Sequence, residues 1–292
     1  MRTKITYPWR SALKYVKELF DVSGLAVVIT GAASGIGLGY ADVMAANGAR
    51  VALLDRDAAG LEKAAQQLSK YGAEILTEEL DATNRQALED AMKRVAEAFG
   101  RIDVLFANVG ISGGPGFVTA TGERPAERMF ENIDNDVLDA VLDVNVGATF
   151  KSIQACLPHM KAAGGGRIIV TSSVSASATE LMVGAAYVVS KGAVKMLVKQ
   201  AARELAAYNI RVNAISPGPV VTNIGGGRLK DPSARGPFEL AAPLGRVATP
   251  EDLYGAALYL ASPASLHMTG AELLIDAGVA LGPDLPAGAM PR

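Results

Sequence analysis

Short apolar runs and longer periodic segments alternate along the chain. Each short run is rich in β-branched and aliphatic residues and predicts a buried strand. Each longer segment carries apolar residues at three- and four-residue intervals and predicts an amphipathic helix, notably over residues 57–71, 84–99, 135–161 and 184–208. Seven strands are predicted, over residues 25–30, 49–55, 74–80, 102–107, 167–173, 210–216 and 272–276.

This alternation predicts an α/β protein with a doubly wound, seven-stranded parallel sheet. Parallel strands need crossover helices, which cover both faces of the sheet. No linker divides residues 23–278, so we expect a single domain there. Residues 1–22 form an N-terminal extension in which 8–20 predict a short basic amphipathic helix, and 279–292 form a C-terminal tail rich in Pro and Gly. We expect this helix to dock on its own domain or a neighbouring subunit rather than on a membrane.

Composition narrows the class of protein. Half of the residues are hydrophobic and 20% are charged, which excludes a disordered chain. The formal net charge of −2 gives no general attraction to nucleic acid or to an anionic membrane. One cysteine, Cys156, and two histidines, His159 and His267, predict neither a disulfide nor a metal site. No segment predicts a membrane span or a secretion signal, so we expect a cytoplasmic protein.

A glycine-rich turn directly follows the first predicted strand and opens a helical segment. Gly31, Gly35 and Gly37 allow the backbone to approach the pyrophosphate of a dinucleotide, next to the free N–H groups of a helix N-terminus. Asp55 ends the second strand about 20 residues later, where a carboxylate can accept both hydroxyls of the ribose. It would repel a 2′-phosphate, which favours NAD; the neighbouring Arg56 keeps NADP as an alternative.

Further motifs resemble those of a known protein family, and this resemblance covers residues 23–278. They are Asp81 after the third strand, Asn108-Val109-Gly110, a Tyr187-x-x-x-Lys191 pair, and a Pro217 to Thr222 segment. Together with the glycine turn, they resemble the short-chain dehydrogenase/reductase family, which implies a Rossmann fold. Val109 departs from the alanine usual at its position, so we expect different packing there. The resemblance also implies a homotetramer or dimer, with the helices over 135–161 and 184–208 as candidate interfaces.

Tyr187 and Lys191 are four residues apart in a predicted helix and therefore share one face. An ammonium and an oxidised nicotinamide nearby can lower the pKa of a phenol. Tyr187 would then accept the alcohol proton while hydride leaves carbon, and Lys191 would also bind the ribose hydroxyls.

The resemblance assigns roles to three more residues. Ser173 would hydrogen-bond the substrate oxygen, with Ser175 or a purely structural turn as alternatives. Asn145 would bend its helix and hold a water that links Lys191 to solvent; the alternative is a helix-interior Asn bonded to backbone. Thr222, with the backbone of Val220, would hold the nicotinamide carboxamide, unless it serves only the loop.

Two segments are expected to set the substrate. Residues 111–133 predict an inserted lip, and 223–244 predict a mobile lid. Leu181, Met182 and Val183 are candidate apolar walls, which favours a medium-sized, largely apolar substrate. We expect local packing for the large residues of the lip and solubilising roles for the basic residues of the lid. These residues are Phe117, Met129 and Phe130 in the lip, and Arg228, Lys230 and Arg235 in the lid.

We therefore predict an NAD-dependent oxidoreductase that interconverts a secondary alcohol and a ketone. An NADPH-dependent 3-ketoacyl-type reductase and a non-catalytic dinucleotide sensor or scaffold remain alternatives. The predicted catalytic residues are Asn145, Ser173, Tyr187 and Lys191. The predicted cofactor-binding residues are Gly31, Ser34, Gly35, Ile36, Gly37, Asp55, Arg56, Asp81, Ala82, Asn108, Gly110, Tyr187, Lys191, Pro217, Gly218, Val220 and Thr222.

Overall fold

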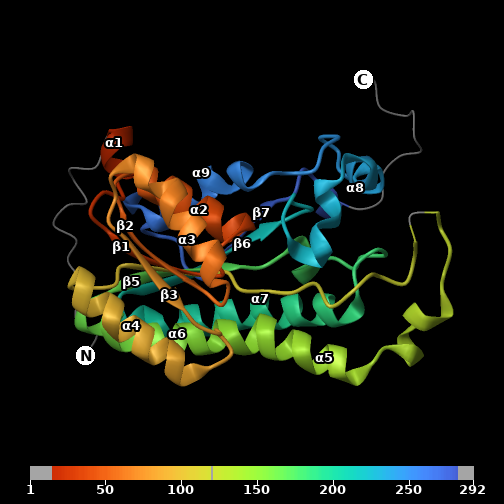
Figure 1. The fold of residues 1–292 in the computed structure, drawn as a ribbon, viewed down its shortest axis with the longest axis horizontal. Coiled ribbons are helices and arrows are strands. Elements are labelled where there is room, and N and C mark those ends of the chain that lie inside the picture. The colour runs from red at the N-terminus through yellow and green to blue at the C-terminus, as the bar shows by residue number, and fades with distance from the viewer. Residues whose placement is uncertain (1–14, 120, 282–292) are drawn as a thin grey trace.

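A seven-stranded parallel sheet forms the centre of the protein. The structure is a computed structural model that describes residues 15–119 and 121–281. The strand order is β3-β2-β1-β4-β5-β6-β7, so the predicted doubly wound Rossmann fold is confirmed (Figure 1). The strands are β1 (Ala26–Thr30), β2 (Arg50–Asp55), β3 (Ile75–Glu79), β4 (Val104–Ala107), β5 (Gly166–Thr171), β6 (Ile210–Pro217) and β7 (Glu272–Ile275).

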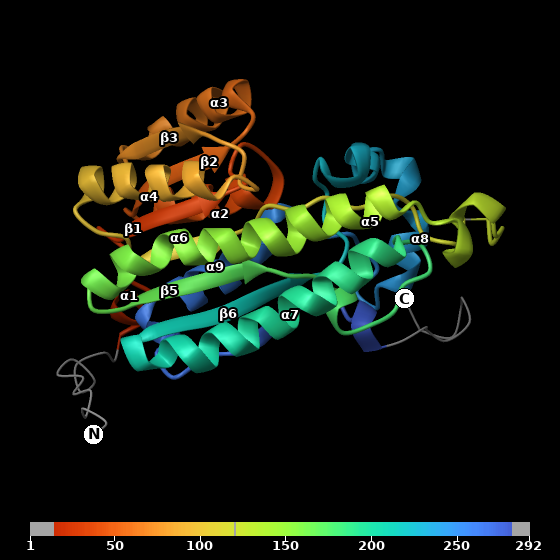
Figure 2. The same ribbon diagram turned by 90° about the horizontal axis from the view of Figure 1, so that it is seen from below.

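Helices cover both faces of this sheet. Alternate residues of β1 point to opposite faces, and every residue of β1 is buried because both faces are covered. One core joins Val28 to helices α4, α6 and α7, and the other joins Val27 to α2, α3 and α9 (Figures 1 and 2). The helices are α1 (Val16–Leu19), α2 (Gly35–Ala46), α3 (Ala58–Leu68), α4 (Arg85–Phe99), α5 (Asn135–Leu142), α6 (Thr149–Ala162), α7 (Ala185–Leu205), α8 (Gly236–Ala241) and α9 (Tyr254–Ala261).

The predicted helix over 135–161 changes its helical type near its middle. A π-helical turn, Asp143–Ala148, separates α5 from α6 and contains Asn145. Such wide turns are rare and occur mostly at functional sites. Beyond this turn, α5 lies at the same end of the molecule as α8 (Figure 2).

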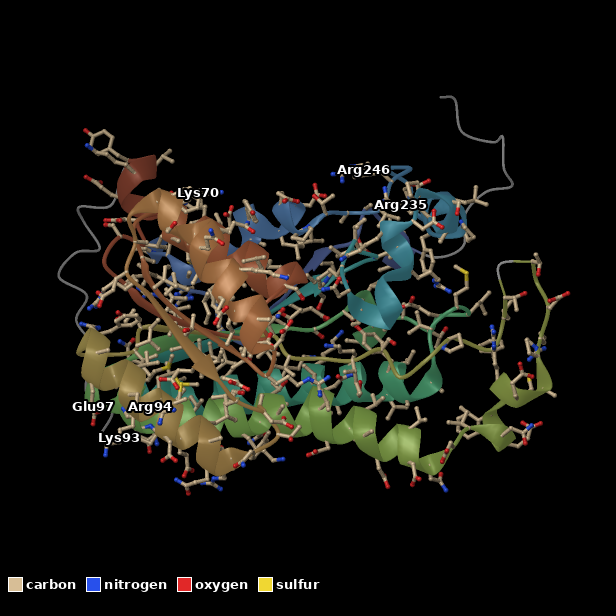
Figure 3. The ribbon with its side chains drawn as sticks, viewed as in Figure 1. Lys70, Lys93, Arg94, Glu97, Arg235 and Arg246 are labelled. Atoms are coloured by element: carbon tan, nitrogen blue, oxygen red, sulfur yellow. The ribbon has the colours of Figure 1, made fainter. Side chains whose placement is uncertain are left out.

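The outer surface of α4 is charged, as expected of an amphipathic helix. Arg94 makes an ion pair with Glu78 at 2.6 Å, and Lys93 and Glu97 form a neighbouring surface pair (Figure 3). Lys93 and Glu97 are exposed and Arg94 is half exposed, so each pair contributes about 1 kcal/mol or less to the free energy of unfolding.

Only part of the predicted N-terminal helix lies within the described residues. Helix α1 spans Val16–Leu19, and the Phe20 ring after it lies 6.5 Å from that of Tyr259 in α9. This end of the extension therefore docks on its own domain. Residues 8–14 of the predicted helix, and the tail beyond residue 281, lie outside the described residues, and the domain boundaries at 22 and 278 stay predictions.

Candidate active site

A cavity of about 910 Å³ opens at the carboxyl ends of the strands. The sheet order reverses direction between β1 and β4, and a doubly wound sheet binds its ligand at such a point. Every predicted site residue lines this cavity except Gly37 and Asn145. These two are buried next to lining residues instead.

The glycine turn is closed by close packing. Gly31 and Gly35 have φ of +68° and +57°, which side chains disfavour. A Cβ on Gly37 would lie 2.0 Å from the carbonyl oxygen of Gly31. Gly37 therefore brings α2 against the turn rather than facing the cavity.

The first amide groups of α2 are left without a side-chain cap. Asp57 and Asn84 cap the next two long helices by accepting the backbone N–H of Gly60 and Ala87, whereas Ser34 makes no such bond to α2. Ser34 and Gly35 line the cavity, so the positive end of this helix is directed at it. An anionic pyrophosphate fits this position.

The carboxylate of Asp55 is held in place by the backbone. Its Oδ2 atom accepts the N–H of Ala33 at 3.0 Å, and its Oδ1 atom accepts that of Asp57 at 3.1 Å. Asp55 and Arg56 both line the cavity. The turn from Gly31 to Gly37 contains no Lys or Arg. The cation closest in sequence to Asp55 is its neighbour Arg56.

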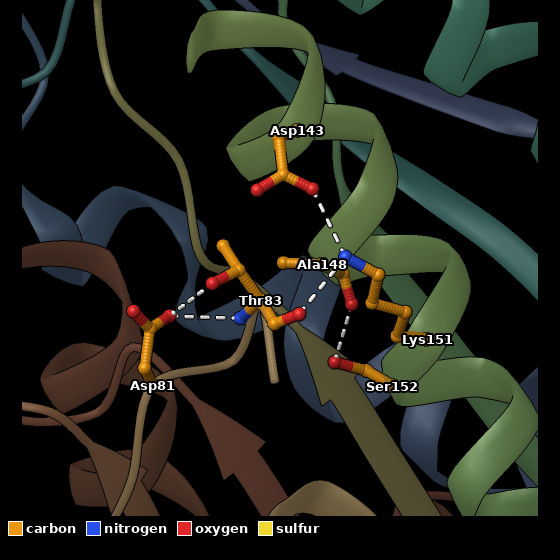
Figure 4. A network of polar contacts seen from close by, with 6 residues as sticks. All are labelled: Asp81, Thr83, Asp143, Ala148, Lys151 and Ser152. Atoms are coloured by element: carbon orange, nitrogen blue, oxygen red, sulfur yellow. Dashed lines mark hydrogen bonds and ion pairs between the residues drawn. The ribbon is translucent and has the colours of Figure 1, made fainter. Parts of the chain in front are cut away.

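A second carboxylate, Asp81, lies beyond β3 in a compact loop. Its Oδ1 atom accepts both the N–H and the hydroxyl of Thr83 at 2.8 Å, and these bonds lower the pKa of Asp81. Lys151 of α6 donates to the carbonyl oxygen of Thr83 and to Asp143, both at 2.9 Å (Figure 4). This bridge, which the sequence analysis did not predict, joins the Asp81 loop to the π-helical turn.

Asn108 connects the glycine turn to β5. Its Nδ2 atom donates to the Gly31 carbonyl at 3.1 Å, and its Oδ1 atom accepts the Thr171 hydroxyl at 2.8 Å. Val109 is partly buried against the core on the α4, α6 and α7 side, which accommodates its extra methyl groups. A Cβ on Gly110 would lie 3.3 Å from the Asn145 side chain, so this position is tightly packed.

Tyr187 and Lys191 share one face of α7, as predicted. The Lys191 ammonium lies 5.5 Å from the centre of the Tyr187 ring and donates to the Thr171 carbonyl at 2.9 Å. Burial lowers the pKa of Lys191 to about 8 and raises that of Tyr187 to about 12. The protein by itself therefore does not lower the pKa of Tyr187 as expected. Burial raises this pKa by more than the hydrogen bond with Ser173 lowers it.

Asn145 is fully buried and clamps the chain after β4. Its Oδ1 atom accepts the Ile111 N–H at 2.8 Å, while its Nδ2 atom donates to the Ile111 carbonyl and to the Ser190 hydroxyl. Asn145 thus ties the π-helical turn to α7 one residue before Lys191. The alternative prediction for Asn145, a helix-interior Asn bonded to backbone, is therefore correct in part. Its side chain bonds backbone, but that of Ile111 in another segment.

A chain of hydroxyl groups leads away from Ser173. The Ser173 hydroxyl donates to that of Ser175 at 3.1 Å, and Ser175 donates to Glu180. Ser173 also bonds Tyr187, which favours it over Ser175 as the residue beside the phenol. The neighbouring Ser172 hydroxyl lines the cavity and is the one buried side-chain polar atom of the described residues without a partner.

The lip and the loop before α7 pack against each other. Pro115 pairs with Val183 in an antiparallel bridge, and a Cβ on Gly116 would lie 2.2 Å from the Leu181 carbonyl oxygen. Met182 and Val183 line the cavity as predicted. Leu181 does not line the cavity and is 60% exposed.

Large residues of the lip lie outside the cavity. Phe130 is 80% exposed, and the Phe117 ring is covered by the guanidinium of Arg124. On the other side, Arg228 lines the cavity and lies over the Phe238 ring of α8.

Arg235 of the lid contacts backbone carbonyls of that segment (Figure 3). Three consecutive glycines of the lid, Gly225, Gly226 and Gly227, have positive φ, a conformation that favours glycine.

The remaining candidate residues lie away from the site. Cys156 is buried in the core, which raises its pKa, and His159 is half-buried on α6. Within residues 15–119 and 121–281, no group of three or more His, Cys, Asp or Glu side chains has the geometry to hold a metal ion. Over the same residues, no helix is long and apolar enough to cross a membrane.

Comparison with known proteins identifies the family. The family model described as "Enoyl-(Acyl carrier protein) reductase" matches residues 31–280. Short-chain dehydrogenase/reductase PhomF of Diaporthe leptostromiformis is 34% identical over 273 residues, which cover 89% of this chain and 93% of that protein. Galactitol 2-dehydrogenase (L-tagatose-forming) of Cereibacter sphaeroides is also 34% identical, with 90% and 97% covered. Among solved structures, carveol dehydrogenase from Mycobacterium avium in complex with NAD superposes with a TM-score of 0.80 at 28% identity, covering 90% and 99%.

The chain therefore belongs to the short-chain dehydrogenase/reductase family. It is an oxidoreductase of the alcohol and ketone class, and the family uses nicotinamide dinucleotide cofactors.

Proposed function

We propose that the protein transfers hydride between a secondary alcohol, or the corresponding ketone, and NAD, with Tyr187 as general acid and base. The arrangement of Tyr187, Lys191 and Ser173 around one cavity carries this proposal. The turn from Gly31 to Gly37 would hold the pyrophosphate, and Asp55 would accept the ribose hydroxyls. Asp81 and Ala82 would contact the adenine, and Pro217, Gly218, Val220 and Thr222 the nicotinamide.

When bound, the nicotinamide ring supplies the hydride acceptor at its C4 atom and returns the hydride in the reverse reaction. In oxidation, the alcohol O–H bond breaks and its proton passes to the Tyr187 oxygen. The Lys191 ammonium favours the phenolate, and the Ser173 hydroxyl donates to the substrate oxygen as charge develops there. In reduction, Tyr187 returns the proton to the forming alkoxide.

The test measures NADH formation by the wild type and Tyr187→Phe over a panel of secondary alcohols, with NAD and NADP in parallel. We expect turnover with NAD and a drop of about 100- to 10,000-fold in Tyr187→Phe. Tyr208→Phe, at the exposed end of the same helical segment, is the matched control and should keep full activity. A preference for NADP would favour the ketoacyl-type reductase, and NAD binding without turnover would favour the sensor.

We also propose that the protein is a homo-oligomer assembled through α5, α6 and α7. These helices lie side by side on one side of the sheet (Figures 1 and 2). Large apolar side chains are exposed on them, namely Val137, Phe150, Val189 and Met196.

A further inference from the structure

Glu180 is a carboxylate in the wall of the active-site cavity to which the proposed reaction assigns no role. It lies in the loop before α7 and lines the cavity with Tyr187 and Met182. Burial raises the pKa of Glu180, and its charge raises that of Tyr187. Glu180 is therefore partly withdrawn from water and close enough to act on the catalytic phenol.

One half of this carboxylate has no protein partner in the described part of the chain. Its Oε1 atom accepts the Ser175 hydroxyl, while its Oε2 atom receives no hydrogen bond and no cation pairs with the group. The Oε2 atom is not among the buried polar atoms without a partner, so this half of the carboxylate is open to the cavity that Glu180 lines. A carboxylate oxygen with free lone pairs can accept a hydrogen bond from a donor on a ligand there.

The position of Glu180 fixes how far that donor lies from the reacting carbon. Ser173, which would hold the reacting oxygen, connects to Glu180 through Ser175. This path contains two consecutive hydrogen bonds, of which the one from Ser173 to Ser175 spans 3.1 Å. A substrate oxygen held at Ser173 therefore leaves the adjoining carbons within reach of Glu180.

The charges around the cavity decide between a neutral and a cationic donor. The Lys191 ammonium lies 5.5 Å from the centre of the Tyr187 ring, so a substrate ammonium on a carbon next to the reacting one would meet a like charge. A hydroxyl is neutral and avoids this repulsion.

We propose that Glu180 accepts a hydrogen bond from a second hydroxyl of the substrate, on a carbon next to the reacting one. This rests on the proposed function, and it makes the substrate a vicinal diol or a larger polyol. It differs from the largely apolar substrate expected from Met182 and Val183.

The test compares trans-cyclohexane-1,2-diol with cyclohexanol, which share one ring and differ by the second hydroxyl. The wild type should favour the diol in kcat/KM by about 10- to 100-fold. Glu180→Leu should lower kcat/KM for the diol about 10- to 100-fold more than kcat/KM for cyclohexanol, mainly through KM, and so abolish this preference. Glu180→Gln, of equal size and still able to accept, should keep part of the preference. Glu204→Gln, on the exposed side of α7, is the control.

Several results would overturn the proposal. They are equal kcat/KM for the two alcohols in the wild type, an equal loss for both in Glu180→Leu, or a preference for trans-2-aminocyclohexanol over the diol. If Glu180→Leu fails to fold, as judged by circular dichroism, the Glu180→Gln variant decides.

A binding measurement separates this inference from the proposed reaction. Saturation-transfer NMR would report competition between the diol and cyclohexanol for Tyr187→Phe with NAD, with and without Glu180→Leu. If the wild type oxidises no alcohol while diol binding to Tyr187→Phe depends on Glu180, the proposed reaction is refuted and the inference is supported. If the wild type turns over both alcohols without preference, the proposed reaction is supported and the inference about Glu180 is refuted.

Discussion

Asp55 determines the charge that the cavity presents to the adenosine ribose. Because both of its oxygens accept backbone amides, the carboxylate is held in one orientation. A 2′-phosphate about 4 Å away would cost about 4 kcal/mol per unit charge at an effective dielectric of 20. Arg56, the adjacent cation, is therefore insufficient in our account to make NADP the preferred cofactor.

Replacing this carboxylate should change cofactor preference. In Asp55→Ala we expect kcat/KM with NAD to fall about 10- to 100-fold, because two charge-assisted bonds to the ribose are lost. With NADP, kcat/KM should stay the same or rise, since the repulsion between Asp55 and the 2′-phosphate is removed. Initial rates with both cofactors measure this. Asp57→Ala removes the next acid, which caps α3 away from the cavity, and should leave the ratio unchanged. An unchanged ratio in Asp55→Ala would refute the assignment.

The pKa values of Tyr187 and Lys191 set the direction of the pH dependence. With its pKa raised to about 12, the phenol keeps its proton at neutral pH, which suits ketone reduction and opposes oxidation. Lys191, lowered to about 8, loses its charge as the pH rises through that value. Reduction should therefore fall above about pH 8, and oxidation should have its optimum at a more alkaline pH. Superimposed kcat/KM profiles for the two directions would contradict this account.

At the scale of elements, the apolar pattern predicted all seven strands. The five central strands are mostly buried and therefore largely apolar, whereas the edge strands β3 and β7 are partly exposed and carry Glu as well as Ile or Leu. Boundaries shifted where side chains bond the turn: β5 ends at Thr171 rather than 173, because Ser173 accepts the N–H of Ser175 and starts a short helix. The sequence also marked Asn145, which lies in the π-helical turn, and most of the predicted site residues line the cavity.

Contacts that depend on tertiary structure could not be predicted in this way. Lys191 donates to the carbonyl of Thr171, and a backbone carbonyl has no sequence signature. Glu180 lies in an irregular loop where no period gives its direction. The Lys151 bridge joins residues that are far apart in sequence.

That bridge gives an element-scale prediction. Lys151→Met should free the loop of Thr83 and Asp81 from the π-helical turn and raise KM for NAD about 2- to 5-fold, the loss expected for one partly exposed bridge. The value of kcat should be unchanged, since Lys151 makes no hydrogen bond with Tyr187. Lys93→Met, which breaks a surface pair on α4, is the control (Figure 3). An unchanged KM for NAD would show that the bridge does not order the loop.

At the scale of the whole molecule, the apolar surface of α5, α6 and α7 is the proposed subunit contact. We expect a dimer or tetramer by light scattering, because clustered exposed apolar side chains mark an interface. Phe150→Glu and Met196→Glu should both yield a smaller species, since each would bury a charge. Val16→Glu replaces an exposed apolar residue of α1, away from these helices, and should leave the mass unchanged. A monomeric wild type would refute the proposal.

The central claim is that hydride passes directly between the carbinol carbon of the substrate and the cofactor, with Tyr187 handling the proton. The most direct test supplies cyclohexanol or cyclohexane-1,2-diol deuterated at the carbinol carbons, together with NAD, and measures the reduced cofactor by mass spectrometry. The account predicts one deuterium at C4 of the cofactor for each ketone formed by the wild type, and about 100- to 10,000-fold less in Tyr187→Phe. Ketone formed without label on the cofactor, or label transferred equally well by Tyr187→Phe, would contradict it.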